Sequence, residues 1–112
     1  MYVQVVTFGL NGITDEEYKR GVESLTEPIA SLPGLLAKIW LRNRDANIYG
    51  GVYLWEDRQA YESYIKGEIF RSIGSNAAFK NAHSQDFEVI EELTKATQPQ
   101  MAIVRELVRS PS

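Results

Sequence analysis

The sequence contains no cysteine and only one histidine, His83, among its 112 residues. Without cysteine, disulfide bonds, thiolate nucleophiles and cysteine-ligated zinc sites are excluded. A single histidine also excludes a metal site built from several histidines of one chain, so we expect no metal. No apolar run approaches the roughly 18 residues that a membrane-spanning helix needs. The residues after Met1 do not resemble a signal peptide.

An excess of positive charge is absent as well. Lys and Arg together number 12 against 15 Asp and Glu, which gives a formal net charge of −3. A nucleic-acid-binding surface normally shows a basic stripe, so we expect no nucleic-acid partner. With 44% hydrophobic and 24% charged residues, the composition is that of a compact globular domain. We therefore expect a single cytoplasmic domain that binds neither nucleic acid nor membrane.

The first strand and the first helix are marked by local signals. Residues 2–10 are rich in β-branched and aromatic side chains, which predicts a strand. Thr14 and Glu17 form a capping box, in which each side chain bonds the backbone N–H of the other residue. An apolar stripe then continues at helical spacing to Ile29. It predicts one helix of about five turns, which ends at Pro33-Gly34.

The remaining elements complete a known order. Residues 35–42 and 48–55 flank an Asn- and Asp-rich turn and predict a β-hairpin. Asp57 is a candidate N-cap for a second helix, a broken helical stretch follows, and a last strand is predicted over residues 86–93. The order β-α-β-β-α-β is that of the ferredoxin-like α+β fold, with an antiparallel sheet and both helices on one face. We assign residues 1–93 to this domain and residues 94–112 to a C-terminal tail. Within the tail, residues 101–109 are a short helix or an extra strand.

Residue parity divides the hairpin into an aliphatic face and an aromatic face. The aliphatic face is predicted to lie under the helices and carries Leu35, Ala37, Ile39, Leu41, Ile48, Gly50, Val52 and Leu54. The other face, expected to be free of helices, carries Leu36, Lys38, Trp40 and Arg42 opposite Tyr49, Gly51, Tyr53 and Trp55. The turn is expected to place Trp40 across from Gly51 and Lys38 across from Tyr53. Gly51 would then leave room for the Trp40 ring.

An aromatic face of this size is unusual on the surface of a monomer and marks an interface or a ligand groove. We therefore expect a homodimer in which two sheets pack face to face, as a dimeric α+β barrel around a cavity. Lys38 and Arg42 would need an anionic or aromatic partner in that layer. Whether Trp40 and Trp55 line a substrate pocket or form only the dimer core stays open.

These residues also carry a family resemblance. It lies in Pro33-Gly34-Leu35-Leu36-Ala37-Lys38-Ile39-Trp40 and in Gly50-Gly51-Val52-Tyr53-Leu54-Trp55-Glu56-Asp57, followed by Ala60 and Tyr64. This pattern resembles the YdhR-type monooxygenases of the dimeric α+β barrel superfamily, over roughly residues 3–93. The resemblance implies that the barrel cavity is the site, that it takes a small aromatic ligand, and that no cofactor is required. Heme-degrading members of the superfamily use an Asn, a Trp and a His, and no inward Asn is found on the first strand, so heme degradation is disfavoured.

The candidate catalytic residues are Lys38, Trp40 and Tyr53. Lys38 would bind an anionic oxygen or stabilise a carbanion or a peroxide-like intermediate, or it would form a salt bridge across the dimer. Tyr53 would donate its hydroxyl to a substrate carbonyl or to a backbone group. His83 is either a general base or a solvated loop residue. The candidate substrate-binding residues are Arg42, Tyr49, Gly51, Trp55 and His83.

Three functions are compatible with these residues. The first is a cofactor-independent monooxygenase that acts on a small aromatic or polycyclic substrate able to lose a proton. The protein would supply a dry apolar pocket and a cation or hydroxyl for the developing charge. The second is a non-catalytic homodimer that binds a small molecule on the same fold. The third is a structural homodimer whose aromatic face is only its interface.

Overall fold

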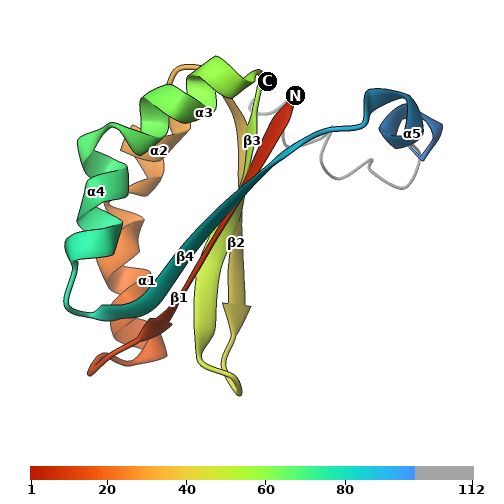
Figure 1. Cartoon of the computed structure of the whole chain (residues 1–112). Coiled ribbons are helices and arrows are strands. Elements are labelled where there is room, and N and C mark those ends of the chain that lie inside the picture. Colours follow the sequence, from red (N-terminus) through yellow and green to blue (C-terminus); the bar gives the residue numbers. More distant parts are fainter. Residues whose placement is uncertain (98–112) are drawn as a thin grey trace.

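The computed structural model describes residues 1–97, which form a four-stranded sheet with helices packed against it (Figure 1). In chain order the elements are β1 (Tyr2–Leu10), α1 (Asp15–Glu23), α2 (Thr26–Ala30), β2 (Leu35–Asn43), β3 (Ile48–Trp55), α3 (Arg58–Ile65), α4 (Glu68–Ser75), β4 (Phe79–Glu88) and α5 (Glu91–Ala96).

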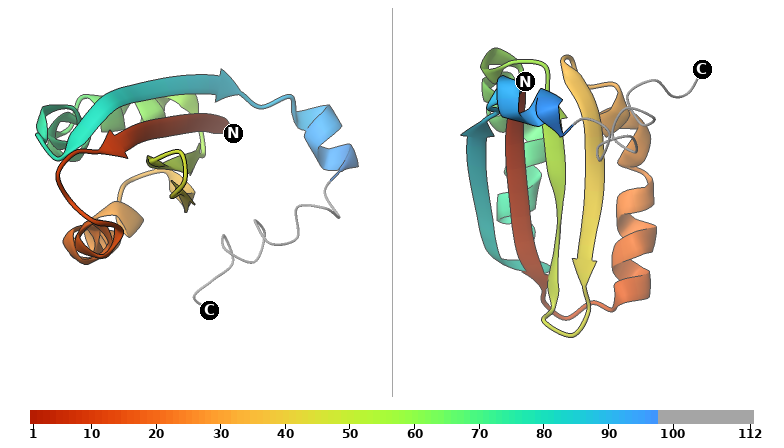
Figure 2. Two further views of the ribbon diagram at one scale, coloured as in Figure 1. Left: turned by 90° about the horizontal axis from the view of Figure 1, so that it is seen from below. Right: turned by 90° about the vertical axis from the view of Figure 1, so that its right-hand side faces the viewer.

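The sheet is antiparallel and has the strand order β2-β3-β1-β4. Helices α1 to α4 cover one of its faces, and α5 lies on the opposite side of the sheet (Figures 1 and 2). This arrangement confirms the predicted ferredoxin-like α+β fold. No helix within residues 1–97 is long and apolar enough to cross a membrane. The division into residues 1–93 and 94–112 stays a prediction, and residues 101–109 lie outside the described part of the chain.

The first helical segment is divided, where one helix of about five turns was expected. The capping box is present: Glu17 N donates to the Thr14 hydroxyl, and Thr14 N donates to the Glu17 carboxylate. The helix then ends at Glu23, and α2 begins at Thr26. Pro28 accounts for the break, because it has no N–H to donate to the Ser24 carbonyl and its ring crowds that carbonyl.

The last strand lies earlier in the chain than residues 86–93. It spans Phe79–Glu88 and pairs along β1, and residues 91–96 are helical instead. As an edge strand it exposes nearly all of its side chains, so its sequence lacks the apolar alternation that identifies a half-buried strand. His83 consequently lies within this strand and not in a loop.

The hairpin register is as predicted, but the two faces are exchanged. Trp40 pairs with Gly51 and Lys38 with Tyr53. The aromatic face nevertheless lies under the helices, since Tyr53 is 1% exposed and Trp55 is fully buried. A β-bulge between Leu35 and Ala37 moves Leu35 to the helix side, where it packs against the core, and leaves the rest of the aliphatic set on the helix-free face.

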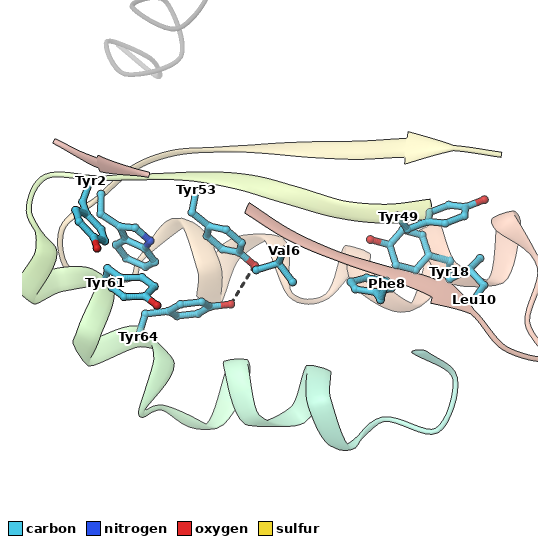
Figure 3. Packing of buried hydrophobic residues seen from close by; sticks show 10 residues of the cluster. Tyr2, Val6, Phe8, Leu10, Tyr18, Tyr49, Tyr53, Tyr61 and Tyr64 are labelled. Carbon is cyan, nitrogen blue, oxygen red and sulfur yellow. Dashed lines mark hydrogen bonds between the residues drawn. The ribbon is translucent and has the colours of Figure 1, made fainter. Parts of the chain in front are cut away.

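The helices supply aromatic side chains that pack against this face of the sheet (Figure 3). Tyr18 of α1 meets Tyr49 with ring centroids 4.9 Å apart, and Tyr64 of α3 meets Tyr53 at 5.1 Å. Offset and edge-to-face contacts of this kind are favourable beyond the area they bury. The prediction that Tyr49, Tyr53 and Trp55 form the dimer interface is therefore wrong, because they lie in the core of one chain.

The helix-free face of the sheet is apolar along its centre. Val5, Val52 and Ile39 are register partners in a row across β1, β3 and β2, and all three are only partly buried. Phe87 of β4 is 47% exposed. A sheet face of this composition calls for a covering partner.

Candidate functional site

A small cavity of about 30 Å3 lies between the sheet and the helices. Its walls come from all four strands and from α1, α2 and α4, and the lining is almost wholly apolar. The lining residues are Val6, Phe8, Tyr18, Val22, Leu25, Ile29, Lys38, Trp40, Gly50, Gly51, Tyr53, Ile69, Ile73 and Phe79. The single charged side chain among them is Lys38. The cavity therefore places one amine in an otherwise dry aromatic surrounding.

Lys38 is held between two aromatic rings. Its Nζ atom lies 3.5 Å from the ring centre of Trp40 and 4.5 Å from that of Tyr53. Within residues 1–97 it makes no salt bridge and no hydrogen bond to a carboxylate. Burial lowers the pKa of Lys38 to about 7, because removal from water disfavours the ammonium form. Near neutral pH the side chain can therefore act both as a base and as a cation.

Gly51 makes room for the lysine stem. A Cβ atom at Gly51 would lie 2.7 Å from Cε of Lys38 and 3.1 Å from the carbonyl oxygen of Ile39. Trp40 pairs with Gly51 across the strands as predicted, but the atoms nearest to a Cβ at Gly51 belong to Lys38 and Ile39 and not to the Trp40 ring. The glycine lets Lys38 cross the surface of β3 toward Tyr53.

Tyr53 closes the floor of the cavity. Its hydroxyl accepts a hydrogen bond of 3.0 Å from the hydroxyl of Tyr64, shown dashed in Figure 3. Burial raises the pKa of Tyr53 far above its usual range, so the phenol stays protonated and can donate its own hydrogen. Tyr18, at the other end of the cavity, likewise has its pKa raised by burial, to about 12.

Arg42 and Tyr49 lie outside the cavity, although both were predicted to bind substrate. Both contact Asp15 in the first turn of α1: the Tyr49 hydroxyl donates to it at 2.7 Å and the Arg42 guanidinium at 3.1 Å. The hydrogen bond from Tyr49 is the main cause that lowers the pKa of Asp15. This cluster ties the start of α1 to the hairpin.

Trp55 and His83 are also separated from Lys38. Trp55 stacks against Tyr53 and donates its indole N–H to Gln4 at 3.3 Å. It borders a different hollow of about 530 Å3, between residues 32–34 and the helices α3 and α4. His83 pairs with Thr7 on β1, so its side chain lies exposed on the helix-free face. The structure therefore does not bring His83 to the cavity.

A wider groove adjoins the cavity at its edge. It has a volume of about 570 Å3, lies between α1 and β2, and shares Tyr18, Val22 and Trp40 with the cavity. Trp40 is 38% exposed. Its indole thus stands between an enclosed apolar space and an open one.

Four of the predicted residues meet at one place, namely Lys38, Trp40 and Tyr53 with Gly51 beneath them. The helix residues Tyr18 and Tyr64 were not predicted as site residues. Their positions on apolar helix stripes were a signal for burial but not for which strand residues they would meet. No group of three or more metal-ligating side chains comes together among residues 1–97.

The four-stranded antiparallel sheet with helices α1 to α4 on one face is a ferredoxin-like α+β fold, and the cavity around Lys38 lies between the two layers. The sequence matches the family described as "Putative mono-oxygenase ydhR" over residues 3–100. The chain belongs to this family. No curated protein matches it significantly.

Solved structures share the fold at low sequence identity. One is SnoaB, a cofactor-independent oxygenase from Streptomyces nogalater, with 21% identity, a TM-score of 0.64, and coverage of 80% of this chain and 92% of that chain. Another is the heme-degrader MhuD from Mycobacterium tuberculosis, with two hemes bound in its active site. Its identity is 19%, its TM-score 0.64, and the coverage 80% and 96%. At these identities the likeness establishes the fold alone.

Proposed function

We propose that this protein is a cofactor-independent monooxygenase that oxidises a small aromatic substrate at Lys38. The family and the fold suggest a monooxygenase or a heme-degrading function. We favour oxygenation of a small aromatic, because β1 carries no asparagine and the one histidine faces away from Trp40. The observation that carries the proposal is an amine in an apolar cavity that has no carboxylate partner within residues 1–97.

Lys38 supplies the proton transfer and the countercharge in this proposal. Its neutral amine removes a proton from an acidic C–H of the substrate, and the resulting ammonium pairs with the substrate anion. Dioxygen then oxidises the anion: one oxygen atom becomes a ring carbonyl, and the other leaves as water with the two hydrogens of the substrate carbon. A general base contributes about 10²–10⁴-fold to such a step when its pKa lies near the working pH.

Substrate enters from the groove, since the cavity is too small for an aromatic ring while Trp40 closes it. Typical ligand sites have about 300–1,000 Å3. Rotation of the exposed Trp40 indole joins the groove to the cavity and presents the substrate to Lys38 and to the Tyr53 ring. The cation–π contact between Lys38 and Trp40 is then exchanged for an ion pair with the substrate anion.

Dioxygen uptake tests the proposed function. We expect the purified chain, treated with a chelator and without added flavin, to consume dioxygen with a panel of anthrones, one molecule for each carbonyl formed. Binding of these compounds without dioxygen uptake would instead identify a non-catalytic binding protein. Absence of both binding and uptake would leave only a structural role.

We also propose that the protein is a homodimer, formed through the helix-free face of the sheet. The row of Val5, Val52 and Ile39 supports this, because a second copy of the same face would remove it from water. Tyr49, Tyr53 and Trp55 take no part, since they lie in the core of each chain. Specific interfaces commonly bury about 800 Å2 per partner, which one face of a four-stranded sheet can provide.

Introducing a charge at the centre of this face is expected to separate the dimer. Val52→Glu places a carboxylate in the apolar row, where it would be desolvated in the dimer without a partner. We expect sedimentation to give twice the 12.7 kDa of one chain for the wild type and a single chain for the variant. Gln59→Glu, which adds the same charge at an exposed position of α3, serves as the control and should stay dimeric. A monomeric wild type at micromolar concentration would contradict the proposal.

A further inference from the structure

The surroundings of Lys38 suit a nucleophile as well as a base. Its Nζ atom is flanked by the rings of Trp40 and Tyr53, and within residues 1–97 no acid neutralises it. The titratable groups that face it across the cavity are two phenols, Tyr53 from β3 and Tyr18 from α1. Both stay protonated, since burial raises the pKa of each. Among residues 1–97 the amine therefore has no carboxylate to hold it in the ammonium form, and only the faces of the two rings favour the cation.

We infer that Lys38 also forms an imine with small aldehydes that enter the cavity. The Nζ lone pair attacks the carbonyl carbon and gives a carbinolamine, a proton passes from nitrogen to the departing hydroxyl, and water leaves as the C=N bond forms. One aldehyde and one amine thus yield one imine and one water, so the step requires neither an oxidant nor a reductant. A lysine desolvated in an apolar pocket is a recognised way to obtain such a nucleophile.

Burial favours this reaction in two ways. An ordinary lysine is almost entirely an ammonium at neutral pH and has no lone pair to donate, whereas burial lowers the pKa of Lys38 to about 7. The apolar lining also limits the water that would hydrolyse the imine. The four other lysines of the chain, Lys19, Lys66, Lys80 and Lys95, are exposed and lack both features.

The size of the cavity sets the class of aldehyde. Its volume of about 30 Å3 is close to the share of one molecule in liquid water. No aldehyde therefore fits this space whole while Trp40 closes it. A short aliphatic aldehyde requires a small movement of the exposed indole toward the groove, and an aryl aldehyde requires a larger one.

Reductive trapping tests the inference. The full chain is incubated without dioxygen at pH 7 with acetaldehyde and cyanoborohydride, which converts an imine into a stable N-ethyl group. Peptide mass mapping then gives the rate at each lysine, with the N-terminal amine scored separately. A pKa about three units below that of an ordinary lysine predicts a larger neutral fraction, so we expect Lys38 to react at least about 10-fold faster than any other lysine. Adducts spread over the exposed lysines, with Lys38 unmodified, would overturn the inference.

Two variants make the result specific. Lys38→Arg keeps the charge, cannot form the imine, and should lose the fast adduct. Trp40→Ala opens the amine to water, so the excess of the trapping rate at Lys38 over the other lysines should fall. The wild type is expected to react faster with acetaldehyde than with benzaldehyde, and this difference should disappear in the variant. An unchanged preference in a folded Trp40→Ala protein would show that the cavity does not activate the amine. Since trapping proceeds without dioxygen, its failure and a failure of the oxygenase proposal are separate outcomes.

Discussion

Replacement of Lys38 by methionine is expected to reduce oxygenation by about 10²–10⁴-fold, which is the contribution of a general base. Methionine keeps much of the packing of the lysine stem between Trp40 and Tyr53, but it removes both the base and the countercharge. The affinity for an anionic aromatic ligand should fall by about 1–3 kcal/mol, the range for a hydrogen bond to a charged group. Dioxygen uptake and calorimetric binding measure the two effects. Lys80→Met on β4, which removes an exposed lysine, is the matched control.

The pH dependence of the wild type gives a second signature of Lys38. Since the base must be neutral, kcat/KM should rise through about pH 7, where burial places the pKa of this amine. Tyr18 and Tyr53 do not titrate in that range, because burial raises the pKa of each. A rate that is flat between pH 6 and 8, or full activity in a folded Lys38→Met protein, would assign Lys38 a structural role.

The same substitution should stabilise the fold. The pKa of Lys38 is lowered in the folded chain, so between about pH 7 and 10.5 the unfolded chain binds more protons and the stability of the wild type increases with pH. The wild type is therefore less stable than Lys38→Met by the largest amount below pH 7, and this difference in the free energy of unfolding vanishes near pH 10.5. Because 1 kcal/mol corresponds to about 4–8 °C in a domain of this size, thermal melts at pH 6 and pH 10 resolve it. Loss of the dimer is not expected, since Lys38 faces the helices.

The helices cover the aromatic face of the hairpin and not the aliphatic face that the sequence predicted, and this difference has a physical reason. Alternation along a strand shows which residues share a face, and the turn fixes their partners across the hairpin, so Lys38, Trp40, Gly51 and Tyr53 were grouped correctly. Alternation does not show which face the helices cover when both faces are apolar. Here the aromatic face could be covered because α1 and α3 bring tyrosines to it, and that contact depends on tertiary placement.

The residues that left the predicted site illustrate the same limit. Arg42 and Tyr49 lie on the same face of the hairpin as Lys38, but they pair with each other four register pairs further toward the turn, where Asp15 meets them. His83 was grouped with the site for its chemistry alone, and the pairing of β4 with β1 places it on the opposite face. The residue types suggested these roles, but the distance of each side chain from Lys38 and the face of the sheet on which it lies exclude them from the cavity.

Gly50→Ala is expected to cause the largest loss of stability. Gly50 has φ +152°, a backbone conformation that side chains rarely adopt, and a Cβ atom there would lie 1.8 Å from the carbonyl oxygen of Val6. That oxygen belongs to the backbone of the central strand β1, so it cannot move aside without disturbing the pairing of β1 with β3. Because the substitution combines backbone strain with a direct backbone clash, we expect it to lower the free energy of unfolding by more than about 4 kcal/mol.

The neighbouring glycine provides the matched control for this prediction. At Gly51 the closest obstacle to a Cβ atom is the Cε atom of Lys38 at 2.7 Å, which belongs to a flexible side chain and can shift. Gly51→Ala should therefore fold with a loss of about 1 kcal/mol, while the displaced amine loses its position between Trp40 and Tyr53 and the rate of aldehyde trapping at Lys38 changes. Thermal and urea unfolding compare the two variants. If Gly50→Ala melts within a few degrees of the wild type, β1 and β3 cannot lie as close as the structure places them.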